Sequence, residues 1–275
     1  IFSAFGSDFD VLPSGGARAG PAGGSRAPDA AARNGGHATS STRAVADGDA
    51  TVRVVDVARG GSGGFQLFGA PVTADGGRGG DATSSAIGIN HGASPVDVFA
   101  SAVGSSGGNT SASGTTPANG GDGGTATLGP VYGASHGGGD VRVIGLVGGG
   151  VGGAGRNGTV GRGQAVHLFN AVDGYTSGSL TLEQAAASGR EGSQGLELDK
   201  NLDNRSLTLV PYALGNGNGP TGGGALAQSV ARNQTGDASA RARAEAGRVL
   251  QHQFGARDAT ASALAESFGE GRVEV

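Results

Sequence analysis

Apolar and polar residues alternate in short runs along the chain, and a cluster of glycines follows each run. The clearest run covers residues 51–57, which contain four valines and no glycine. Comparable runs begin at Val96 and Val141. Alternation in a short β-branched run is typical of a strand with one buried face. The pattern therefore predicts β-strands separated by glycine-rich turns.

The runs recur at a nearly constant interval. Val52, Val96 and Val141 are separated by 44 and then 45 residues, and Ala-Thr-Ser-Ser occurs at Ala38 and again at Ala82. After Val141 the interval shortens. A fixed period of this length indicates a repeat architecture.

The period divides the chain into three parts. Phe2, Phe5 and Phe9 lie near the start, where we expect an aromatic cap over the first repeat. The parts are residues 1–34, an N-terminal cap and glycine/proline-rich segment; residues 35–219, the repeat region with a period of about 44–45; and residues 220–275, degenerate C-terminal repeats or a cap.

The predicted fold is all-β, a parallel β-solenoid (β-helix) with glycine-rich turns. A solenoid turn takes about 20–25 residues, so one period should hold two turns. His91 and His136, which share a repeat position, should then lie about 9.6 Å apart, twice the strand spacing. The alternative fold is a polyglycine II-type helical bundle, since extended glycine helices pack closely without side chains.

Composition narrows the functional classes. The net charge is -4 without a dense basic patch, which argues against nucleic-acid binding. The absence of cysteine excludes disulfides and thiolate metal sites, and is common in exported bacterial proteins. No apolar run approaches the roughly 20 residues that span a bilayer, so we expect no membrane span.

Glycine-rich turns raise the question of calcium, the one cofactor that the pattern leaves open. The calcium-binding nonapeptide has an aspartate two residues before a large apolar residue. Residues 76–83 match it as far as Asp81 but place Thr83 at the apolar position. The candidate calcium ligands are the turn aspartates Asp47, Asp49, Asp81 and Asp122.

No catalytic constellation emerges. His91 and His136 are expected to be too far apart to share a metal ion, and His37, His167 and His252 lack an oriented partner. Asp47, Asp49 and Asp56 are the carboxylates close enough in sequence to suggest glycoside cleavage, but Asp47 and Asp49 look like turn formers. We expect no enzymatic activity.

The Gly-Gly-x-Gly-Gly turns, together with residues 131–143 and 166–182, resemble the glycine-rich repeat proteins that bacteria export. Some of those proteins carry a PEP-CTERM sorting tail, and others resemble adhesin or autotransporter passengers. The resemblance covers residues 35–219 and transfers no catalytic motif. It implies an extracellular or cell-surface location and an adhesive or matrix role.

The sequence therefore predicts a non-catalytic extracellular structural or adhesive repeat protein, such as a stalk, matrix or filament element. Its partners would be further copies of itself or a surface or carbohydrate ligand. Two alternatives remain: a phage-type receptor-binding tip and a carbohydrate-active β-solenoid enzyme.

Overall fold

A computed structural model describes residues 2–3, 11–22, 32–65, 74–110, 117–189, 194–214, 224–246 and 258–275. These residues form eighteen β-strands and no helix. Consequently none of them forms a helix able to cross a membrane. Phe5 and Phe9 of the expected aromatic cap lie outside the described residues.

The strands form three parallel sheets. The nine-stranded sheet contains β2 (Ser14–Arg18), β4 (Val52–Arg59), β6 (Val96–Val103), β8 (Val141–Gly148), β11 (Ser179–Ala187), β13 (Ser206–Leu214), β15 (Asp237–Ala240), β16 (Arg243–Glu245) and β18 (Val273–Glu274). The five-stranded sheet contains β1 (Phe2–Ser3), β3 (Ala38–Ala46), β5 (Ala82–Asn90), β7 (Ala126–Ser135) and β10 (Asp173–Tyr175). The four-stranded sheet contains β9 (Val166–Phe169), β12 (Gln194–Leu202), β14 (Ala225–Asn233) and β17 (Ala259–Ser267).

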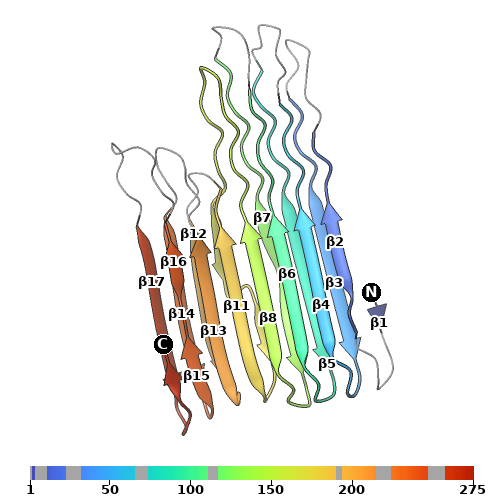
Figure 1. Cartoon of the computed structure of the whole chain (residues 1–275), viewed down its shortest axis with the longest axis vertical. Helices are drawn as coiled ribbons and strands as arrows, with labels where there is room; N and C mark the ends of the chain where they lie inside the picture. Colours follow the sequence, from blue (N-terminus) through green and yellow to red (C-terminus); the bar gives the residue numbers. More distant parts are fainter. Residues whose placement is uncertain are drawn as a thin grey trace.

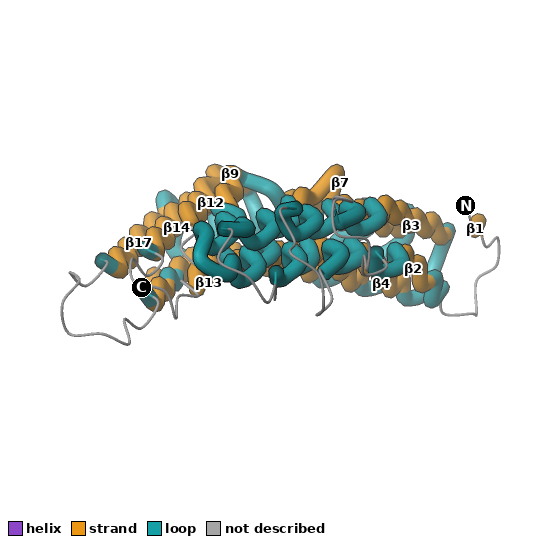
Figure 2. The backbone as a smooth tube through the Cα atoms, turned by 90° about the horizontal axis from the view of Figure 1, so that it is seen from above, coloured by secondary structure: helices purple, strands orange, loops and turns teal. Residues whose placement is uncertain are grey.

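The sheets make an elongated slab of two layers (Figures 1 and 2). The nine-stranded sheet is one layer, and the other two sheets lie against it. From β3 to β8 the chain changes layer at every strand, so one period of 44 or 45 residues moves it by one strand position in each layer. A single column of paired residues crosses the large sheet: Val52, Val96, Val141, Leu180, Leu207, Ala238 and Val273.

The expected parallel β-solenoid is therefore wrong. The strands belong to separate parallel sheets stacked face to face, and no pairing joins β9 to β7 or β10 among the described strands. The error came from treating each glycine cluster as the corner of a coil. One period adds one strand to each layer, and it does not form two turns of a coil.

The core between the layers is thin because large residues face small ones. Val54, Val98 and Val143 of the nine-stranded sheet are fully buried. The facing strand carries Gly88, where an added Cβ would lie only 2.9 Å from a methyl group of Val98. Toward the C-terminal end, leucines such as Leu182 replace the valines. This complementarity explains how a chain with 59 glycines can still bury a continuous apolar interior.

The alternative fold, a polyglycine II-type bundle, is also wrong for the chain as a whole, because long strands in register build both layers. The glycine clusters continue these strands as extended segments (Figure 1, the wavy upper part). Gly60 and Gly63 donate hydrogen bonds within their layer, and Gly61 and Gly64 donate across to residues 33–36 of the other layer. The N–H groups of the glycine segment thus point in the same direction at every third residue, whereas those of a β-strand do so at every second residue.

Candidate functional site

The four candidate calcium ligands are not brought together. Asp47 and Asp49 are exposed in the turn after β3, at one end of the strands. Asp81 and Asp122 lie at the opposite end, beside the glycine segments of the second layer. In the described part of the chain no three histidine, aspartate or glutamate side chains form a group that could hold a metal ion.

Asp81 already has a cation as its partner. Its two carboxylate oxygens accept hydrogen bonds from Arg78 at 2.6 and 3.0 Å, and one of them accepts the main-chain N–H of Thr125 at 2.7 Å. Burial alone would raise the pKa of Asp81, but these hydrogen bonds outweigh it and hold the pKa at about 2. Asp81 therefore ties Arg78 and the next repeat together.

Several other aspartates and asparagines connect successive repeats in the same way. Asn34 accepts the N–H of Arg78, Asp75 accepts that of Asn119, and Asp122 accepts that of Arg162, at 2.7 to 2.9 Å. Each side chain reaches the residue 40 to 44 positions later. Sequence reasoning missed this role, although polar residues recurring at the repeat interval were the available signal.

Asp56 lies fully buried between the layers. It accepts hydrogen bonds from Ser40 and Thr42 at 2.7 Å each and from Ser84 at 2.5 Å, all from the facing sheet. The carboxylate is thus enclosed by hydroxyl groups and does not face a groove. This position makes Asp56 a structural link between the layers and removes it from the carboxylates considered for glycoside cleavage.

The spacing expected for the repeated histidines is wrong. The ring centroids of His91 and His136 lie 5.2 Å apart, with only 12° between the ring planes. The reason is again that one period moves the chain by one strand, so Asn90 and Ser135 are directly paired neighbours. Tyr175 extends the column, with its ring centroid 5.5 Å from that of His136.

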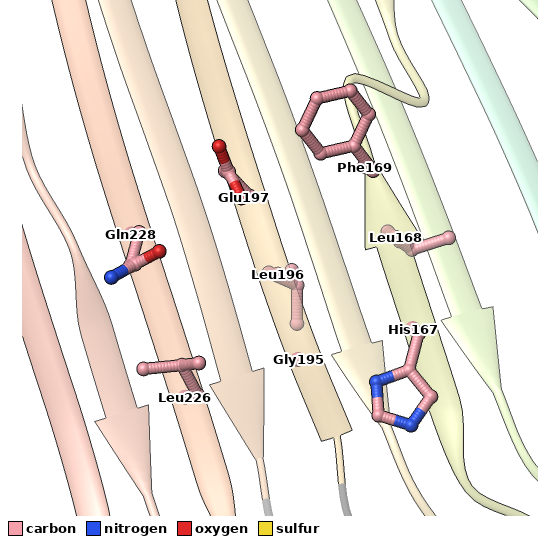
Figure 3. A pocket seen from close by; sticks show the side chains of 8 residues that line it. All are labelled: His167, Leu168, Phe169, Gly195, Leu196, Glu197, Leu226 and Gln228. Atoms are coloured by element: carbon pink, nitrogen blue, oxygen red, sulfur yellow. The ribbon is translucent and has the colours of Figure 1, made fainter.

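A shallow groove of about 240 Å³ lies on the outer face of the four-stranded sheet (Figure 3). Val166 and Leu168 point inward, so alternation places His167 and Phe169 on the outer face. Phe169 is 70% exposed. The groove is lined by His167, Leu168, Phe169, Gly195, Leu196, Glu197, Leu226 and Gln228.

Polar side chains without partners surround this apolar surface. Glu197 and Gln228 point outward from β12 and β14 (Figure 3). Within the described residues, the side chains of His167, Glu197 and Gln228 make no hydrogen bond or ion pair. Gly195 keeps the floor open beneath His167, because an added Cβ would lie 3.1 Å from the imidazole. The groove can therefore hold a small group that has an apolar face and polar edges.

No protein-family model, no curated protein and no solved structure matches this chain.

Proposed function

We propose that the chain is a non-catalytic structural or adhesive repeat protein of the bacterial cell exterior, serving as a stalk, matrix or filament element. The observation that carries this proposal is the uninterrupted pairing of equivalent residues from Val52 to Val273 across one sheet. Each repeat contacts mainly its neighbours, so the architecture extends in one direction. The cysteine-free composition and the exported glycine-rich proteins that the sequence resembles support the location.

The outer edge of β17 supports self-association into filaments. β17 has nine residues and pairs with β14 on one side, and no described strand pairs with its other side. Because Ala225 donates its N–H to Asp258, the alternation of a parallel ladder turns the N–H of Ala261 toward the free edge. A free edge of this length can pair with another copy in a head-to-tail contact, which generates filaments when the rotation does not close.

The test removes one hydrogen-bond donor from this edge. Ala261→Pro deletes the outward N–H, and Ala261→Ser is the matched control that keeps it. Sedimentation velocity should show large assemblies for the wild type and for Ala261→Ser, and a shift to small species for Ala261→Pro. A wild-type chain that stays monomeric at high concentration, or identical assemblies from both variants, would contradict assembly through this edge.

The groove supports the adhesive part of the proposal, with a carbohydrate as ligand. A sugar ring combines an apolar face, which packs on an aromatic ring, with hydroxyl groups that bind carboxylates and amides. Phe169, Glu197 and Gln228 supply these groups. On a glycan array, Phe169→Ala should abolish binding, whereas Phe268→Ala, which changes another exposed phenylalanine outside the groove, should retain it. Equal binding by both variants would exclude the groove as the contact.

A further inference from the structure

His91 and His136 occupy equivalent positions, each directly after the last residue of its strand, β5 or β7. Both side chains are exposed. Their rings are nearly parallel at a centroid separation of 5.2 Å, so each ring covers one face of the other. Tyr175 lies beside His136. The nitrogen-bearing edges of the two stacked rings are therefore left open to a ligand.

The ring nitrogens are free to bind. No described residue forms a hydrogen bond or ion pair with the imidazole of His91 or His136, whereas His37 contacts Asp81. Neutral imidazole prefers borderline-soft ions such as Zn²⁺, Ni²⁺ and Cu²⁺ over the hard ion Ca²⁺. The chemistry differs from that of the aspartates considered above, which offer only oxygen.

The geometry permits shared coordination. Two nitrogens bound to one tetrahedral ion at about 2.0–2.1 Å lie about 3.4 Å apart. The two rings are nearly parallel, with their centroids 5.2 Å apart. Both side chains therefore have to rotate until the lone pairs in the two ring planes converge on one ion. Exposed side chains make such rotations readily. Water would complete the coordination of the ion.

We propose that His91 and His136 form a two-histidine site for a divalent transition-metal ion. The ion joins two successive repeats at the end of the five-stranded sheet, opposite the glycine segments. Because the bound ion links neighbouring strands in the native state alone, it stabilises the stack against unfolding. This inference does not depend on the proposed function.

The test measures Zn²⁺ and Ni²⁺ binding by calorimetry in the wild type and in His91→Ala, His136→Ala and His167→Ala. His167→Ala is the matched control, since it removes a solitary exposed histidine. We expect each of the first two variants to weaken binding at least about ten-fold, to a similar level, and the control to bind as the wild type does. Acidification should also weaken wild-type binding, because imidazole must be neutral to bind the ion.

A second readout locates the ion directly. In NMR spectra of the imidazole nitrogens, Zn²⁺ should shift the signals of His91 and His136 first, and Ca²⁺ should shift neither. The proposal is overturned if the wild type does not bind, if His91→Ala and His136→Ala bind as the wild type does, or if His167 responds at the same metal concentration. Circular dichroism of each variant checks that the fold is retained.

Discussion

Replacement of Gly121 by alanine tests the close approach of the glycine segments. Gly121 donates its N–H to the carbonyl of Gly108 at 2.9 Å, and Gly108 donates its own to the carbonyl of Gly77 at 2.8 Å. A Cβ at position 121 would lie 2.0 Å from the Gly77 oxygen. A carbon normally stays about 3.3 Å or more from a carbonyl oxygen, so the segments must separate by roughly 1.3 Å.

The cost follows from the two hydrogen bonds that this separation breaks. The N–H groups of Gly121 and Gly108 then lose their acceptors, and each buried donor left without a partner costs about 1–3 kcal/mol, so Gly121→Ala should lower the free energy of unfolding by about 2–6 kcal/mol. The control is Gly20→Ala, because an added Cβ there meets no atom within 4 Å. Alanine at this position should stabilise the fold by about 0.4–1 kcal/mol, since it restricts the unfolded chain.

Urea unfolding followed by circular dichroism measures both variants. Because repeat proteins can unfold in parts, hydrogen exchange of residues 117–124 provides a local measurement. Exchange should accelerate strongly there in Gly121→Ala and remain unchanged in Gly20→Ala. If Gly121→Ala lost less than about 1 kcal/mol and kept its protection, the glycine segments would not be packed as described.

Two further predictions concern aspartates. Asp56→Ala removes the carboxylate that accepts from Ser40, Thr42 and Ser84, and Ser84 keeps only the main-chain carbonyl of residue 56 as an acceptor. The substitution should cost about 3–5 kcal/mol in urea unfolding, against about 0–1 kcal/mol for Asp97→Ala on the neighbouring strand β6. Equal losses would contradict a buried link. Arg78→Ala tests the pKa of Asp81, which is about 2 in the folded chain and therefore lies below the unfolded value near 3.9. The Arg78–Asp81 pair stabilises the fold fully at pH values above the pKa of Asp81 in the unfolded chain. This stabilisation is lost as the pH falls through the pKa of Asp81 in the folded chain. The stability difference between wild type and Arg78→Ala should thus shrink between about pH 4 and pH 2, and a constant difference would refute the role of Arg78.

The sequence predicted the register of the strands better than their arrangement. The interval from Val52 to Val96 and Val141 corresponds to direct pairing in one sheet, because inward-facing positions of a strand are fixed by their period of two. The interval does not reveal how many times the chain reverses within one period. Counting two turns per period placed His91 and His136 too far apart, and this removed a possible metal site from consideration.

The glycine clusters and the aspartates show a second limit. A run such as residues 60–64 is compatible with a tight turn or with an extended segment, because glycine adopts both conformations readily. Main-chain hydrogen bonds within and between the layers hold this run in the extended conformation. The role of Asp56 was equally hidden, because its partners Ser40 and Ser84 come from two different strands of the facing sheet.

The central claim is that the chain is a structural element that extends by stacking, and electron microscopy of the purified protein tests it most directly. Negative-stain images followed by cryo-electron microscopy, with and without a chelator, should show uniform filaments in which the strands lie across the long axis. The filaments should persist after chelation, since the proposed assembly joins the copies by backbone pairing at the edge of β17 and not by a metal ion. Dispersed single particles at all concentrations would contradict the claim.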